Sequence, residues 1–141
     1  LTAEMSEFLS QGTRTAHVAY LATDGRPLVA PVWFVVEDGC PTFATGLTTA
    51  KGRALVRDPR VSLTVDAPEP PYAFLQVQGT AEIDRRPAEV LRIATACGGR
   101  YMGVERADEF GRRNADPDEV VVRVRPFRVI HNEDVTAPTV R

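Results

Sequence analysis

The chain has 141 residues, of which 43% are hydrophobic and 26% charged, and its formal net charge is −2 at pH 7. This length and composition are typical of one soluble globular domain, and the lack of a basic excess argues against a nucleic-acid-binding protein. Because no apolar run approaches the roughly 20 residues of a membrane span, and the N-terminus lacks the basic-then-apolar pattern of a signal peptide, we expect a single cytoplasmic domain over residues 1–141.

The first half of the chain predicts a short helix followed by an antiparallel meander. Residues 2–11 carry apolar side chains at helical spacing. The pairs Asp24-Gly25 and Asp38-Gly39 are typical of tight hairpin turns, because they tolerate positive φ. Pro31 cannot donate a hydrogen bond to a sheet, so its strand is predicted to be bulged or to lie at an edge. The turns separate three expected strands, Arg14–Ala22, Pro27–Glu37 and Cys40–Gly46.

The second half predicts a short helix and then alternating strands and helices. Thr48 or Thr49 can cap the helix, and Asp58-Pro59 ends it, because a residue before proline avoids the helical region. Gly79 predicts a bulge or a close approach within a long strand. The expected elements are a helix over Ala50–Arg57, strands over Arg60–Asp66 and Tyr72–Arg85, a helix from Pro87 to about Cys97 that Gly98-Gly99 ends, a short helix over Arg100–Asn114 interrupted at Gly103, and a strand over Glu119–Arg125 that continues as Phe127–His131.

These elements give six or seven strands, with helices between some of them and a tail over residues 132–141 that has no core signal. A meander followed by a long strand and a closing strand predicts a mainly β fold, an antiparallel barrel that is either closed or split.

The segment Thr45–Pro59 holds the only lysine of the chain, Lys51, among sixteen arginines. A helix N-terminus offers unpaired N–H groups and a partial positive charge, so it attracts phosphate or carboxylate. Hydroxyl groups and further cations lie around the lysine, at Thr45, Thr48, Thr49, Arg53 and Arg57. We interpret the segment as an anion site. The alternative is that a threonine only caps the helix and that the cations form a solvated face.

Other kinds of site have less support in the sequence. Neither a Walker loop nor a GxGxxG fingerprint is present. His17 and His131 have no nucleophile beside them, and no group of residues has metal-ligand spacing, so we name no catalytic residue and no metal site. Cys40 and Cys97 are predicted to be buried, reduced side chains. Trp33, beside Pro31, can flank a flat ring at a strand edge, or it can belong to the core.

Three segments in fixed order resemble the pyridoxamine-phosphate-oxidase-like, flavin-binding split-barrel family. They are GRPLVAPVWFVVEDG (Gly25–Gly39), TFATGLTTAKGRALVRDPRVSLTVD (Thr42–Asp66) and VQGTAEI (Val77–Ile83). GGRYMG (Gly98–Gly103) and RVRPFRVI (Arg123–Ile130) are similar to the actinobacterial branch that uses coenzyme F420, a deazaflavin. The resemblance covers nearly the whole chain.

This resemblance implies a six-stranded antiparallel split β-barrel with short peripheral helices, which forms a homodimer with two cofactor sites at the subunit interface. Gly79 would mark the interface strand, and Tyr101 would reach the partner's site. The cofactor-binding residues that it implies are Val29, Ala30, Pro31, Val32 and Trp33 along the ring, and Thr45, Thr49, Ala50, Lys51, Arg53 and Arg57 around the phosphate.

The function that the resemblance implies is hydride transfer from reduced coenzyme F420 to an unsaturated organic small molecule, an enone, a quinone or a tetrapyrrole. One alternative is an oxidoreductase that uses flavin mononucleotide (FMN), but the flavin-binding oxidases carry arginine where this chain has Ala50. The F420 branch often has asparagine where this chain has Ala54. A second alternative is a protein that carries or senses F420 or a flavin with little turnover.

Overall fold

The computed structural model describes residues 1–138, and within them the chain forms one seven-stranded antiparallel sheet with four α-helices around it. The strands are β1 (Ala16–Leu21), β2 (Pro27–Val32), β3 (Val35–Glu37), β4 (Cys40–Gly46), β5 (Arg60–Asp66), β6 (Phe74–Asp84) and β7 (Glu119–Asn132). The helices are α1 (Ala3–Ser10), α2 (Ala50–Arg57), α3 (Pro87–Met102) and α4 (Ala107–Asn114), with a 3₁₀ turn, η1, at Val104–Arg106. The predicted mainly β, split-barrel class is therefore confirmed. Residues 139–141 of the predicted tail lie outside the described residues.

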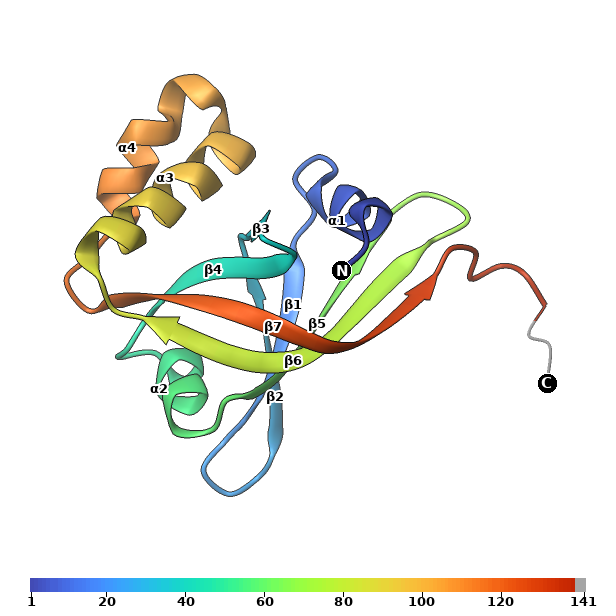
Figure 1. Ribbon diagram of the computed structural model, residues 1–141, viewed down its shortest axis with the longest axis horizontal. Coiled ribbons are helices and arrows are strands. Elements are labelled where there is room, and N and C mark those ends of the chain that lie inside the picture. The colour runs from blue at the N-terminus through green and yellow to red at the C-terminus, as the bar shows by residue number, and fades with distance from the viewer. Residues whose placement is uncertain (139–141) are drawn as a thin grey trace.

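The sheet has the strand order β2-β1-β5-β6-β7-β4-β3, so its two edge strands are consecutive in the chain. Only Trp33 and Phe34 join β2 to β3. The sheet therefore curls until its two edges approach each other at this two-residue connection, which we call the seam (Figure 1). The prediction of a single strand over Pro27–Glu37 is therefore wrong. The segment forms two strands, so the sheet has seven strands where the family resemblance implies six. Pro31 lies on an edge strand, as predicted.

The longest strand pair, β6 with β7, contains the predicted irregularity at Gly79. The register shifts between Gln78, which is opposite Arg128, and Gly79, which is opposite Pro126. A Cβ atom at Gly79 would lie 2.5 Å from the carbonyl oxygen of Arg125, so the approach of the two backbones requires glycine. The bulge accommodates Pro126 inside a central strand, and β7 runs unbroken through the two segments that were expected on either side of this proline.

Helix α3 continues to Met102, so the prediction that Gly98-Gly99 ends it is wrong. These glycines serve helix packing, because a Cβ atom at Gly98 would lie 2.8 Å from Cβ of Phe110 in α4. The helix ends at Gly103, where φ is 102°. The region expected to form one interrupted helix is accordingly divided among the end of α3, η1 and α4.

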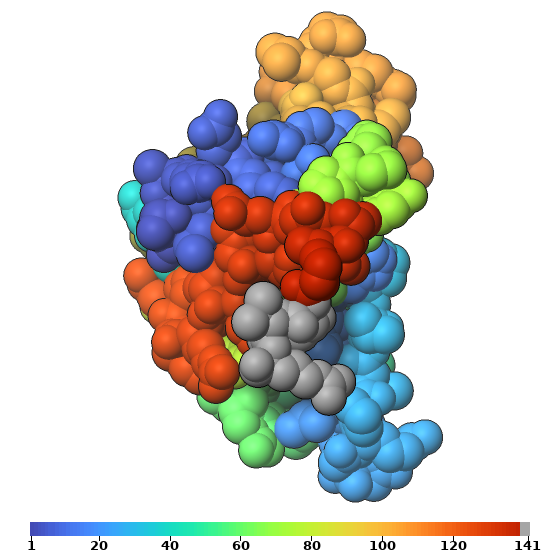
Figure 2. Space-filling model, turned by 90° about the vertical axis from the view of Figure 1, so that its right-hand side faces the viewer, coloured from blue at the N-terminus to red at the C-terminus, as the bar shows by residue number. Residues whose placement is uncertain are grey.

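The helices cover the barrel from different sides (Figure 1). Helix α1 packs against β3, α2 against β1, β4 and β6, and α3 against β3, β4 and β7. Seen from the side, the β1–β2 hairpin, in light blue, projects at one end of the molecule and the α4 region, in orange, projects at the other (Figure 2). The main core fills the barrel, and a smaller cluster lies between α3 and the sheet around Ile93 and Val121. None of the helices in residues 1–138 is long and apolar enough to cross a bilayer.

Candidate functional site

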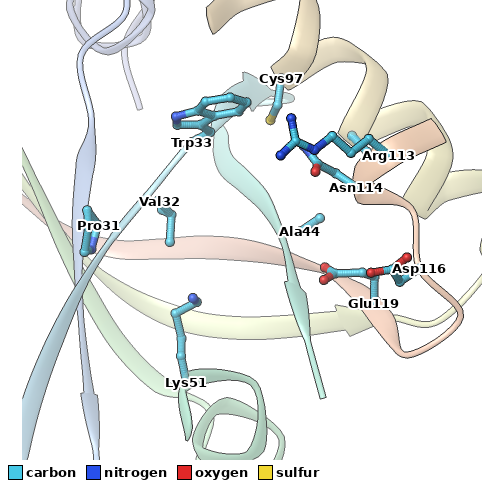
Figure 3. A pocket seen from close by; sticks show the side chains of 11 residues that line it. Pro31, Val32, Trp33, Ala44, Lys51, Cys97, Arg113, Asn114, Asp116 and Glu119 are labelled. Carbon is cyan, nitrogen blue, oxygen red and sulfur yellow. The ribbon is translucent and has the colours of Figure 1, made fainter. Parts of the chain in front are cut away.

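A pocket of about 280 Å³ opens where the ends of β2, β4 and β7 meet the helices α2, α3 and α4. Figure 3 shows its side chains converging from these elements on one space. The lining residues are Pro31, Val32, Trp33, Ala44, Lys51, Ala94, Cys97, Arg113, Asn114, Asp116 and Glu119. The pocket thus brings together the two segments that the sequence singled out, around Trp33 and around Lys51.

The N-terminus of α2 presents Lys51 to this pocket. The helix spans the predicted residues, and Thr49 is its N-cap: the Thr49 hydroxyl accepts from Gly52 N at 3.0 Å and donates to Gly46 O at 2.7 Å. Because this hydroxyl is occupied by the cap, it anchors the helix to the end of β4. The backbone N–H groups of Ala50 and Lys51 have no partner within residues 1–138. The helix start therefore has free donors beside an ammonium group, as an anion site requires.

The Lys51 ammonium is half-buried and forms no hydrogen bond or ion pair with residues 1–138. Burial lowers the pKa of Lys51 from its ordinary value, and the charge of Glu119 opposes this shift. In Figure 3, Lys51 points from α2 into the space that the other lining side chains surround. A half-buried cation without a partner can bind an anionic group of a ligand.

A second wall of the pocket is apolar. Pro31 and Val32 are the last residues of the edge strand β2, and Trp33 follows them at the seam. The Trp33 ring is 36% exposed and stacks on Tyr101 in α3, with ring centroids 5.1 Å apart and an interplanar angle of 3°. Trp33 is thus neither a fully buried core residue nor a free surface residue. It forms one end of the pocket.

A third wall is acidic and was missed from the sequence. Asp116 and Glu119 line the pocket, and Asp118 accepts a hydrogen bond from the Thr48 hydroxyl at 3.1 Å beside it. Burial raises the pKa of Glu119, and the carboxylates of Asp118 and Asp116 raise it further, while Lys51 lowers it. The pairing of Glu119 with Gly46 brings this acidic segment to the start of α2, about 70 residues away along the chain.

Several other predicted residues do not line the pocket. Val29 is 67% exposed, while Thr45 is buried and its hydroxyl lies 3.4 Å from that of Thr49. Arg53 donates to the carbonyl of Thr48, and Arg57 donates to the carbonyl of Leu21 at 2.9 Å. Ala30 and Ala50 are also absent from the lining. Among the predicted cations, Lys51 alone is placed in the pocket.

Of the remaining reactive side chains discussed from the sequence, Cys97 lines the pocket, and Cys40 and His131 do not. Cys40 and Cys97 are free and buried, as predicted, and burial raises the pKa of the Cys97 thiol to about 12. His131 packs against Phe8 in α1, with ring centroids 5.4 Å apart. Residues 1–138 contain no group of three or more His, Cys, Asp or Glu residues that could hold a metal ion.

Comparison with known proteins identifies a matching family and several similar structures. Residues 1–132 match the family profile described as pyridoxamine 5'-phosphate oxidase. A conserved hypothetical protein from Mycobacterium tuberculosis has a similar structure, with a TM-score of 0.81 and 25% identity over 100% of this chain and 91% of that one. A protein described as an F420 reductase gives a TM-score of 0.66 and 26% identity over 88% of this chain and 94% of that one.

A further solved structure, a heme-binding protein from Mycobacterium smegmatis, has a TM-score of 0.71 and 24% identity, over 96% of this chain and 55% of that one. A search of curated protein sequences found no match. The relatives therefore share the split-barrel fold, while their described ligands differ.

Proposed function

Because this chain belongs to the pyridoxamine 5'-phosphate oxidase family, we propose that it is an oxidoreductase that uses reduced coenzyme F420 to transfer hydride to an unsaturated organic substrate. We propose that residues 1–141 act as a single cofactor-binding domain. The observation that carries the proposal is the pocket, which the unpartnered Lys51 ammonium shares with the apolar residues Pro31, Val32 and Trp33.

The residues of this pocket fit a cofactor that joins a flat ring to a phosphate. The Lys51 ammonium and the free backbone N–H of Lys51 at the start of α2 would hold the phosphate. The wall from Pro31 to Trp33 would hold the ring, because an apolar strand edge packs against a flat surface and still offers backbone groups. When bound, the deazaflavin supplies the hydride, and the protein orients it and excludes water.

The acidic wall favours F420 over FMN on electrostatic grounds. Coenzyme F420 carries its phosphate as a singly charged diester, whereas a phosphate monoester such as that of FMN carries between about 1.5 and 2 negative charges at pH 7. Lys51 of α2 and Arg113 of α4 are the cations that line the pocket, and Asp116 and Glu119 are its carboxylates. Because the two carboxylates offset the two cations, the pocket tolerates one negative charge better than two. Ala50 also favours F420 over FMN. The flavin-binding oxidases carry arginine at this position, so this chain lacks a cation that would help to hold a second negative charge.

We propose that two copies of the chain complete the site as a homodimer. The pocket of one chain, about 280 Å³, is at the lower limit of the volumes that enclose whole organic ligands, roughly 300 to 1,000 Å³. Beside the bulge, Phe127 is 73% exposed, and Ile130 of the same strand is 39% exposed. Large apolar side chains exposed on a sheet are typical of a surface that another protein covers.

Binding titrations with the two cofactors test the proposal. Trp33 is the only tryptophan and lines the pocket, so its fluorescence reports occupancy directly. We expect coenzyme F420 to bind at least about 10-fold more tightly than FMN, which corresponds to about 1.4 kcal/mol. Tighter binding of FMN would move the assignment to the flavin alternative. Binding of F420 without reduction of any enone, quinone or tetrapyrrole would favour a carrier or sensor.

The pH dependence of cofactor binding has a predicted sign. Below its raised pKa, Glu119 is neutral and does not repel a phosphate, but above this pKa it is ionised and does. Because its pKa is lowered, Lys51 loses its positive charge at a lower pH than an ordinary lysine does. Both effects weaken binding as the pH rises. We therefore expect the affinity for F420 to fall as the pH rises, first as Glu119 ionises and then as Lys51 loses its charge.

Glu119→Gln should tighten F420 binding about 3- to 10-fold near pH 7 and flatten the acidic part of this profile, because it removes one nearby negative charge. The measurement is the Kd of F420 by Trp33 fluorescence at a series of pH values. Glu69→Gln is the matched control, since Glu69 lies in a different hollow beside Gly12 and Arg14. If the Glu119 variant keeps the wild-type profile, Glu119 does not act on the bound phosphate.

A further inference from the structure

The seam between β2 and β3 depends on two side chains of α3. Sheet pairing ends at Val32 and resumes at Val35, so the backbone between them lacks a neighbouring strand. The Tyr101 hydroxyl accepts from Phe34 N at 3.3 Å and donates to Arg14 O at 2.7 Å. The Arg100 guanidinium donates to Phe34 O at 2.6 Å. These side chains replace the missing sheet hydrogen bonds at the point where the barrel is split.

Arg100 also ties the seam to the N-terminal segment. Its guanidinium donates to Leu9 O at 2.7 Å and to Gly12 O at 3.0 Å, in addition to Phe34 O. One side chain therefore satisfies three backbone carbonyl groups. The same group lies over the Phe34 ring, 4.6 Å from its centroid, and over the Tyr101 ring, 5.0 Å from its centroid. Arg100 thereby holds Tyr101 and the seam in one fixed arrangement.

Tyr101 does not line the pocket, but its ring stacks on Trp33, which does. The two rings are nearly parallel, and Phe110 of α4 contacts the same indole in a tilted arrangement, with centroids 6.1 Å apart. The indole also lines the pocket, where Figure 3 shows it beside Cys97. A shift of Tyr101 would release both the Trp33 ring and the Phe34 backbone, because it contacts both.

We propose that Tyr101 is the positioning residue of the ring wall: it acts through Trp33 and the Phe34 backbone to keep the Pro31–Trp33 segment in the shape that accepts a flat cofactor. The inference rests on the proposed function for the nature of the ligand, but the position of Trp33 can be measured without any ligand. Tyr101 acts within its own chain, whereas the family resemblance placed it toward the partner's site.

Two substitutions separate the parts of this role. Tyr101→Phe keeps the stacked ring and removes the hydroxyl, which leaves Phe34 N and Arg14 O without their partner. Tyr101→Leu removes both. Leu91→Ala is the control on the same helix, since Leu91 is 44% exposed and does not line the pocket. The measurements are acrylamide quenching and near-ultraviolet circular dichroism of Trp33 in the free protein, followed by the Kd for F420.

We expect Tyr101→Leu to raise the quenching constant of Trp33 about twofold, to remove its near-ultraviolet signal and to weaken F420 binding about 10-fold. Tyr101→Phe should keep the wild-type quenching constant and weaken F420 binding about threefold. Leu91→Ala should match the wild type in both measurements. The proposal is overturned if Tyr101→Leu leaves the quenching constant unchanged, or if it changes that constant without weakening binding. If the wild-type protein binds neither cofactor, the proposed function fails, and the quenching comparison still decides whether Tyr101 holds Trp33.

Discussion

Lys51→Ala is expected to weaken binding of coenzyme F420 by about 5- to 150-fold, or about 1–3 kcal/mol, the range for a lost charge-assisted hydrogen bond. The physical reason is that the Lys51 ammonium is half-buried in the pocket without a partner in residues 1–138, so a bound phosphate is expected to provide one. The measurement is the Kd from Trp33 fluorescence, with the unfolding temperature recorded for each variant so that a loss of fold is not mistaken for a loss of affinity.

Arg53→Ala and Arg57→Ala are the matched controls, because these cations lie on the same helix within six residues of Lys51. Their guanidinium groups donate to the carbonyls of Thr48 and Leu21 and do not line the pocket. We expect each to change the affinity by less than about threefold, the effect of a screened exposed charge. An equal loss in all three variants would mean that Arg53 and Arg57 also contact the phosphate, as the family resemblance implied. An unchanged affinity in Lys51→Ala would remove Lys51 from the site.

The parts of the site that could be predicted from the sequence depend on local chemistry. Helix α2 begins and ends at the predicted residues, because a threonine cap and an Asp-Pro pair fix its limits within one short segment. The bulge at Gly79 was predictable for a similar reason, since a lone glycine inside a β-prone run indicates a close backbone approach. In both cases the residues that determine the structure are neighbours in the chain.

The parts that could not be predicted depend on contacts between distant segments. The run from Pro27 to Glu37 is β-prone throughout, and its division at Trp33 and Phe34 arises because the two halves lie on opposite edges of the curled sheet. The acidic wall arises because β4 pairs with β7, which places Glu119 beside Gly46. A charged run before a closing strand is the one local signal of that wall, and such runs are usually solvated. Local pattern therefore located Lys51 but not the groups that surround it.

Gly52→Ala should be the most destabilising small change near the site. A Cβ atom at this position would lie 2.0 Å from Gly46 O and 2.8 Å from Gly46 C, and backbone atoms cannot give way as the end of a flexible side chain can. Alanine favours a helix by roughly 0.5–1 kcal/mol over glycine, so a gain would be expected from propensity alone. The clash opposes this gain, and we expect a net loss of about 3 kcal/mol in the free energy of unfolding.

This loss would couple stability to cofactor binding, because the same contact holds α2 against the end of β4. If α2 moves away to relieve the clash, the cap bonds of Thr49 to Gly46 and Gly52 are strained and Lys51 moves with the helix. Urea unfolding would measure the first effect, and titration with F420 at a temperature where the variant is folded would measure the second. Val56→Ala is the control, since Val56 lies on the exposed face of the same helix and should change the free energy of unfolding by less than about 0.5 kcal/mol. A Gly52→Ala variant as stable as the wild type, with unchanged affinity, would show that the close contact of α2 with β4 does not position Lys51.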